Sequence, residues 1–207
     1  MGEGGHMGKR QEAALETKHK IVRAVKELME EKSVEEMNIE EITTRAGVAK
    51  GSFYTHFKRK EDVVSEIALL EYSVVKNAIV HSSQDVYSRL SEFLKKSVAI
   101  IEKGTLQVAQ QWIKSVSAPL EEEKSGIRKY QFDRETVISL LNQAVERKEL
   151  IEKTPVDQLS NCIIDSYYGA VVTWCMNKGE QRSLIESIDD YCLYCLEPIL
   201  EKYKKEK

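Results

Sequence analysis

The 207-residue sequence contains little glycine and proline, with ten glycines and three prolines, and three of the glycines fall within the first five residues. Few helix-breaking residues, together with abundant Glu, Lys, Leu and Ile, favour helical structure. No segment shows the sustained alternation of apolar and polar residues that is typical of a half-buried strand. The composition therefore predicts an all-α fold.

Long apolar runs are also missing, because no stretch approaches the roughly 18–20 residues needed to cross a bilayer. Residues 1–7 contain no apolar segment of a secretory signal, and their glycine-rich text with His6 and Met7 is typical of a cloning remnant. We therefore expect residues 1–14 to be a remnant and disordered tail. The remaining chain is expected in the bacterial cytoplasm, with no membrane partner.

Residue patterns that carry catalysis or metal binding are absent. The four histidines are scattered, and we find no Ser-His-Asp arrangement and no glycine-rich phosphate loop. Cys192 and Cys195 have metal or redox spacing, but on a helix they share one apolar face and no strand precedes them. We expect no enzyme, no cofactor and no metal. The four cysteines (Cys162, Cys175, Cys192, Cys195) are interpreted as buried, reduced thiols, with thiol sensing left open.

Charge is unevenly distributed along the chain, whose net charge is −3. Residues 1–60 carry 12 basic against 10 acidic side chains, and the remainder carries 19 against 24. Between Ile42 and Lys60 there are five basic residues and no acid (Arg45, Lys50, Lys58, Arg59, Lys60). Screening limits electrostatic reach to about 8–10 Å, so such a local patch can attract phosphates. A basic run is more often an ordinary solvated face, so this patch alone does not establish DNA binding.

Apolar residues recur at three- and four-residue spacing and predict about nine helices. The expected segments are 17–31, 39–46, 49–57, 60–80, 86–101, 106–116, 121–148, 155–175 and a last helix that follows Ser183 and reaches Tyr203. Thr154-Pro155 indicates an N-cap followed by proline at the first helical position. Ser183 with Glu186 forms a capping box, and Pro198 should kink the last helix.

Residues 38–57 have the layout of a helix-turn-helix. Asn38 and Glu41 indicate a capping box at the start of the first helix, and Gly47 permits a left-handed end. Phe53 and Phe57 are four residues apart and share the core face of the second helix. The opposite face is small, polar and basic, as a helix entering a major groove about 12 Å wide requires. A helical hairpin used only for packing is the alternative interpretation.

These residues also resemble a known family. Ile42, Ala46-Gly47-Val48, Lys50-Gly51, Phe53-Tyr54, His56-Phe57 and Lys60 are similar to the signature of the tetracycline-repressor (TetR) family of bacterial regulators. The resemblance covers about residues 17–70. It implies a three-helix DNA-binding domain at 15–60, a fourth helix as linker, and an effector-binding and dimerisation domain at 61–207. The last two helices would form a four-helix bundle across a homodimer.

The resemblance also implies roles for single residues. Lys50, Tyr54, His56 and Lys60 would hold phosphates, while Lys50, Gly51, Ser52 and Thr55 would face bases, and we add Thr43 and Thr44 to this DNA-binding set. Ala49 departs from the family, which often has a Ser or Thr cap there. Loss of that capping hydrogen bond is worth about 1 kcal/mol.

An effector pocket and a dimer interface are further expectations. The pocket would be lined by Phe93, Gln110, Trp112, Tyr130, Asn142, Tyr167, Tyr168 and Trp174, although ordinary core packing also accounts for each. Its aromatic, mostly apolar lining favours a hydrophobic or amphipathic effector. The interface would use Ile163, Tyr167, Ala170, Val171, Ile188, Cys192, Cys195, Leu196 and Ile199.

The sequence thus predicts a homodimeric transcriptional regulator whose partners are operator DNA, a second copy and a small molecule. In this hypothesis a repressor leaves its palindromic operator when the effector binds. A helical enzyme or redox protein that uses the cysteines is one alternative. A non-DNA interaction protein built on a dimeric bundle is another.

Overall fold

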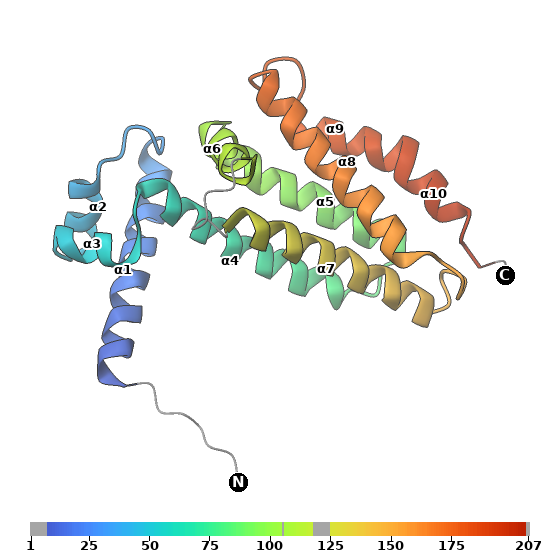
Figure 1. Cartoon of the computed structure of the whole chain (residues 1–207), viewed down its shortest axis with the longest axis horizontal. Coiled ribbons are helices and arrows are strands. Elements are labelled where there is room, and N and C mark those ends of the chain that lie inside the picture. Colours follow the sequence, from blue (N-terminus) through green and yellow to red (C-terminus); the bar gives the residue numbers. More distant parts are fainter. Residues whose placement is uncertain (1–7, 105, 118–124, 206–207) are drawn as a thin grey trace, which may run out of the picture. The chain divides into compact units, whose positions relative to one another are not determined.

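The computed structural model describes residues 8–104, 106–117 and 125–205. Within these ranges the chain is helical, without a strand, and the expected all-α fold is confirmed (Figure 1). The helices are α1 (Lys9–Glu31), α2 (Ile39–Ala46), α3 (Lys50–His56), α4 (Lys60–Val80), α5 (Val86–Lys103), α6 (Leu106–Ser117), α7 (Ser125–Glu146), α8 (Val156–Met176), α9 (Leu184–Tyr191), η1 (Cys192–Leu196) and α10 (Glu197–Glu201). Counted with α9, η1 and α10 as one helix, the described residues form nine helices.

The chain divides into two compact units, Met1–Leu70 and Glu71–Lys207, with the division inside α4 rather than at its start. In the first unit, α1 contacts both α2 and α3. The fully buried side chains there include Ile21, Val25 and Leu28 of α1, Ile42 of α2 and Phe53 of α3. Helix α1 begins at Lys9 rather than near Thr17, so residues 9–14 are helical instead of a tail. Residues 11–16 are exposed and carry no apolar stripe, which is why periodicity missed them.

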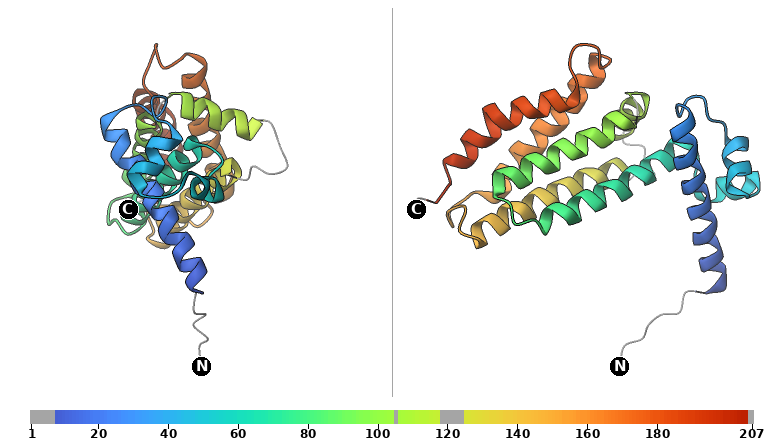
Figure 2. Two further views of the ribbon diagram at one scale, coloured as in Figure 1. Left: turned by 90° about the vertical axis from the view of Figure 1, so that its left-hand side faces the viewer. Right: turned by 180° about the vertical axis from the view of Figure 1, so that it is seen from behind.

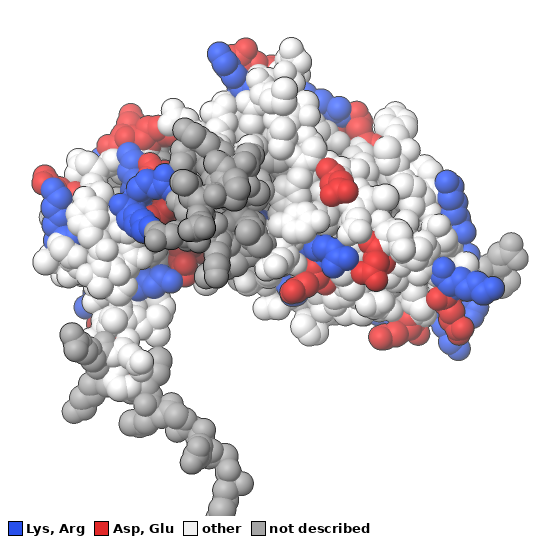
Figure 3. Space-filling view, in the orientation of Figure 1, with Lys and Arg blue, Asp and Glu red and all other residues white. Residues whose placement is uncertain are grey.

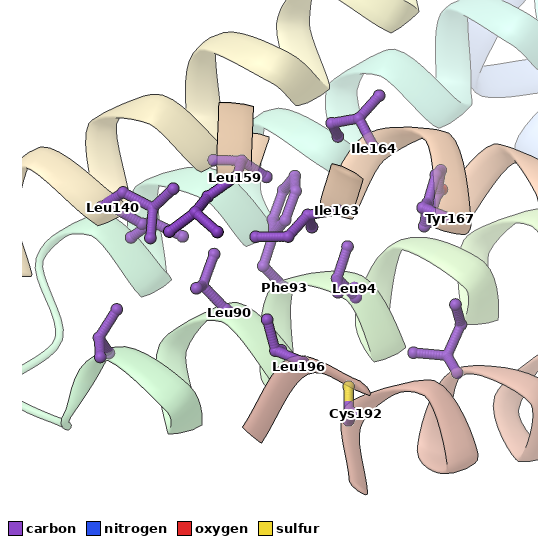
Figure 4. Packing of buried hydrophobic residues seen from close by; sticks show 14 of the residues in the cluster. Leu90, Phe93, Leu94, Leu140, Leu159, Ile163, Ile164, Tyr167, Cys192 and Leu196 are labelled. Carbon is purple, nitrogen blue, oxygen red and sulfur yellow. The ribbon is translucent and has the colours of Figure 1, made fainter. Parts of the chain in front are cut away.

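The second unit encloses a core built from α5, α7, α8 and the C-terminal helix. Helix α5 packs against α9, and α7 packs against α8 (Figure 2). Figure 4 shows Leu90 and Phe93 of α5 facing Leu159 and Ile163 of α8, with Leu196 of η1 beside them. Within the described ranges, no helix is both long and apolar enough to span a membrane.

Proline widens the C-terminal helix into one π turn. The Glu197 amide donates to the Cys192 carbonyl, five residues back, instead of to the residue four back. Pro198 lacks an N–H, and its ring crowds the carbonyl four residues earlier, so regular α-helical bonding cannot continue through it. The expected distortion at Pro198 therefore takes the form of η1.

Of the two caps expected in the C-terminal half, one is confirmed and the other is wrong. Ser183 and Glu186 form the capping box of α9. Thr154 does not cap α8: its hydroxyl donates to the Ile151 carbonyl, and Pro155 itself occupies the N-cap position. The helix expected over 121–148 is described from Ser125 to Glu146, and residues 118–124, Pro119 included, lie outside the described residues.

Candidate nucleic-acid interface and ligand cluster

A glycine turn joins α2 and α3. Gly47 ends α2 in the left-handed region (φ 65°, ψ 38°), where its N–H donates to the carbonyls of Thr43 and Thr44. Only glycine adopts this conformation without a steric penalty. Asn38 caps α2 by accepting the Glu41 N–H at 2.9 Å. In the expected capping box the Glu41 carboxylate would also accept the Asn38 N–H. It pairs instead with the Lys32 ammonium at 2.5 Å.

The inner face of α3 anchors it to the first unit. Phe53 is fully buried and Phe57 is 6% exposed, with their ring centroids 5.8 Å apart. Tyr54 packs edge-on against Phe53 at 5.6 Å and is still 53% exposed. As expected, Ala49 gives α3 no side-chain cap. The orientation of this helix is therefore set by two buried aromatic rings and the turn at Gly47.

The outer face of α3 presents most of the residues assigned to DNA. Lys50, Gly51, Tyr54 and Thr55 are exposed, while Ser52 and His56 are half-buried. A Cβ atom added at Gly51 would meet no neighbour within 4 Å. The Thr55 hydroxyl donates to the Gly51 carbonyl at 3.2 Å. This face is small and open, as approach to a DNA groove requires, and its contacts with bases remain a prediction.

Three assigned residues lie elsewhere or have other partners. Thr43 is 4% exposed, and its hydroxyl donates to the carbonyls of Ile39 and Glu40, so its side chain faces the protein interior. Thr44 is exposed, although its hydroxyl also donates to the Glu40 carbonyl. The Lys60 ammonium donates to the carbonyls of residues 35 and 37, both at 2.8 Å. Lys60 therefore fastens the α1–α2 loop, and a phosphate contact would require it to leave that loop.

Acidic side chains accompany the basic patch. Arg45 forms two hydrogen bonds with Glu31, at 2.8 and 3.0 Å, which raise the pKa of Arg45. Lys50 pairs with Glu40 at 2.7 Å, and this hydrogen bond raises the pKa of Lys50. Figure 3 shows acidic side chains beside basic ones on this unit. Sequence reasoning missed these partners because they lie outside residues 42–60, on α1 and at the start of α2.

In the second unit, aromatic side chains gather around Tyr168 of α8. Trp112 of α6 stacks on its ring with centroids 5.3 Å apart and an interplanar angle of 20°. Tyr130 of α7 lies 5.7 Å away, and Tyr167 packs edge-on at 5.0 Å. Four of the eight assigned pocket residues are thus brought together.

A buried ion pair adjoins this aromatic group. Lys129 and Asp133, one turn apart on α7, are 6% and 1% exposed and form a salt bridge. The Lys129 ammonium also lies 3.7 Å from the ring centroid of Tyr72, on α4, and 5.6 Å from that of Tyr167. The Tyr168 hydroxyl donates to Asp133 Oδ2 at 2.6 Å. Burial lowers the pKa of Lys129 and raises the pKa of Tyr167 and Tyr168. Sequence reasoning named none of Tyr72, Lys129 and Asp133.

The other four assigned pocket residues are placed differently. Phe93 is 1% exposed and belongs to the hydrophobic core. Gln110 and Asn142 are exposed, and the Gln110 amide donates to the Cys175 carbonyl at 3.0 Å. Trp174 is half-buried beside Gly179.

The residues assigned to the dimer interface are mostly internal. Six of the nine are buried in the core of this single chain (Ile163, Tyr167, Val171, Ile188, Cys192, Leu196). Ala170 and Ile199 are half-buried and Cys195 is exposed. Cys162 is exposed as well, so the expectation of four buried thiols is wrong for two of them. Burial raises the pKa of the Cys192 thiol to about 11.

A helix-turn-helix followed by a helical body is an architecture typical of DNA-binding transcriptional regulators. Residues 21–67 match the family model of bacterial regulatory proteins of the tetR family. This match lies within the first unit, whose helix-turn-helix is similar to that of tetR-family regulators.

Solved structures support the same fold. A putative tetR-family regulator from Mesorhizobium loti is 19% identical with a TM-score of 0.62, over 92% of this chain and 98% of that chain. FadR from Bacillus subtilis in complex with stearoyl-CoA is 18% identical with a TM-score of 0.59, over 84% and 95%. Thermus thermophilus FadR in complex with lauroyl-CoA is 16% identical with a TM-score of 0.60, over 87% and 93%. At these identities the likeness concerns the fold.

Proposed function

We propose that the protein is a homodimeric repressor that leaves a palindromic operator when a small, largely apolar effector binds its second unit. The observation that carries the DNA half of this proposal is α3, whose aromatic inner face is buried while Gly51, Tyr54 and Thr55 are exposed. Thermus thermophilus FadR, a similar structure, is described as a transcriptional repressor in complex with lauroyl-CoA. That description supports the proposal that ligand binding and release from DNA are coupled in this protein.

A second copy would cover an apolar surface on α8 and the C-terminal helix. Large apolar side chains are exposed along these two elements (Val172, Met176, Ile185, Leu193, Tyr194), and Met176 and Tyr194 are 76% and 70% exposed. Apolar side chains gathered in this way mark interaction surfaces. A two-fold dimer would present two copies of α3 to half-sites about 34–36 Å apart, which is one turn of DNA. This surface replaces the mostly buried set expected from the sequence.

DNA binding is tested by footprinting the full chain on the intergenic DNA upstream of its own gene. Protection of a palindrome is expected, and its affinity should fall steeply with salt because phosphate contacts release counterions. Thr55→Glu should abolish protection, since it places a carboxylate on the outer face of α3. Lys153→Ala changes the net charge by the same amount in an exposed turn far along the chain, and should protect normally.

Two results would contradict this assignment. Binding without a protected palindrome would leave only non-specific attraction to DNA. Equal protection by Thr55→Glu and Lys153→Ala would remove α3 from the interface. Dimerisation is measured separately by light scattering, where Met176→Glu should yield monomers and Lys153→Ala should not.

A further inference from the structure

Two buried polar atoms beside the Lys129–Asp133 pair have no hydrogen-bond partner among the residues that the structure describes. They are Asp133 Oδ1 and the Tyr167 hydroxyl, on side chains that are each 1% exposed. Polar atoms this deeply buried are nearly always paired, and an exception calls for an explanation. Asp133 Oδ1 can only accept a hydrogen bond from a donor. The site therefore offers a carboxylate oxygen to a group that the described residues do not supply.

The surroundings of the Lys129 ammonium are those of an aromatic cage. One tyrosine ring lies 3.7 Å from the nitrogen and a second lies 5.6 Å away, and the Asp133 carboxylate completes the set. Ring faces attract ammonium ions through their quadrupole, and the attraction grows when water is excluded. The same arrangement of rings and carboxylate recognises ammonium groups on ligands.

Stability alone does not account for this pair. Removing two charges from water costs several kcal/mol per ion, and well-packed apolar residues in place of a buried ion pair are often as stable or more so. Here the pair leaves one carboxylate oxygen unpartnered, which weakens its contribution further. The arrangement has a function if the Lys129 ammonium can be replaced by the cation of a ligand.

We propose that Asp133, with the rings of Tyr72 and Tyr167, is the recognition site for an organic ammonium group on the effector, and that Lys129 holds this place in the effector-free protein. This inference rests on the proposed sensor function of the second unit. Exchange of one cation for another keeps the buried charge balanced, while the flexible lysine stem returns its ammonium to water.

An anionic effector fits the cluster less well. Asp133 already neutralises Lys129, and its free oxygen would repel a carboxylate or phosphate placed beside it. The stack of Trp112 on Tyr168 lies next to the same carboxylate, because the Tyr168 hydroxyl donates to Asp133. An aromatic or other flat apolar body attached to the ammonium group suits that stack.

Calorimetry on the full chain tests the proposal with arylalkyl ammonium ions of one to six methylenes, matched with the corresponding neutral alcohols and carboxylates. We expect at least one ammonium ion to bind tenfold or more tightly than its alcohol and carboxylate. Asp133→Asn should abolish that preference. Asp157→Asn alters a carboxylate in an exposed pair with Arg134 and should retain it. Lys129→Met, which removes the internal competitor, should raise ammonium affinity tenfold or more and leave alcohol affinity unchanged.

A second pair of variants covers the case in which Asp133→Asn does not fold. Tyr167→Phe keeps the ring face and should keep ammonium binding, whereas Tyr167→Leu removes it and should weaken ammonium binding tenfold without affecting the alcohols. Equal affinities for all three probe classes in the wild-type protein would overturn the proposal, as would unchanged ammonium affinity in Lys129→Met. Operator footprinting on the same samples distinguishes failure of this inference from failure of the proposed function. If the wild-type protein protects its operator but shows no preference for ammonium ions, only the ligand class is refuted. If it does not protect the operator, the proposed function is refuted.

Discussion

Arg89 provides a quantitative test of how the second unit is held together. Its side chain is fully buried, with one guanidinium nitrogen donating to Gln143 at 2.8 Å and another to Glu149 at 3.0 Å. The other Glu149 oxygen accepts the Val86 N–H at 2.5 Å. Glu149 therefore joins the start of α5 to the segment that follows α7, and Arg89 holds this carboxylate in place.

The expected cost of Arg89→Met follows from these contacts. Removal of one partner from a fully buried ion pair costs about 3–5 kcal/mol, because the other charge stays buried. The Glu149 side chain is 22% exposed and keeps its bond from Val86, so we expect about 2 kcal/mol for this substitution. Glu149→Leu leaves the wholly buried guanidinium without its counter-ion and should cost more, about 3–4 kcal/mol. The double variant should cost less than the two single losses added together.

Urea unfolding of the full chain at one fixed protein concentration measures these differences, since dimerisation makes stability depend on concentration. A loss of about 2 kcal/mol corresponds to a fall of about 4–8 °C in Tm for a chain of this size. Three results would refute the reasoning: a cost below about 0.5 kcal/mol for Arg89→Met, a smaller cost for Glu149→Leu than for Arg89→Met, or strict additivity in the double variant.

Three further predictions concern the turn, the thiols and the exposed helix surface. Gly47→Ala should cost about 1–2 kcal/mol in urea unfolding because of its positive φ, whereas Gly51→Ala, with open space around its Cβ, should be neutral or stabilising. Cys175 and Cys192 should resist iodoacetamide at pH 8 in the folded protein and react after unfolding, measured by mass spectrometry, because both are buried and burial raises their pKa. Gly169 is exposed on α8, three residues before Val172 of the proposed dimer surface, and its Cβ would meet nothing within 4 Å in a single chain. Gly169→Glu should therefore shift the light-scattering mass toward the monomer without lowering the helicity measured by circular dichroism. A stable dimer of Gly169→Glu would place the interface elsewhere.

Helical segments that bury one apolar stripe could be predicted from the sequence. Helical turns that extend beyond that stripe and are exposed on all sides could not. Periodicity detects a helix through the face it buries, which explains the correct placement of α4 and the late start expected for α1. Thr43 is a residue that spacing could have placed correctly. It lies four residues after Ile39 and one after the buried Ile42, on the inner side of α2, where backbone carbonyls satisfy its hydroxyl. Its addition to the DNA-binding set did not take this helical face into account.

The Lys129–Asp133 pair shows the limit of sequence reasoning more sharply. A lysine and an aspartate four residues apart are typical of a solvated helix surface, where such a pair contributes a few tenths of a kcal/mol. Nothing in their spacing reveals that Tyr72 and Tyr167 enclose the ammonium, because those rings come from α4 and α8, far away in sequence. Burial by other elements thus changes a minor surface contact into a charged site with an unpartnered oxygen. The chemistry of the effector has to be argued from that three-dimensional enclosure, since the aromatic residues alone indicated only an apolar ligand.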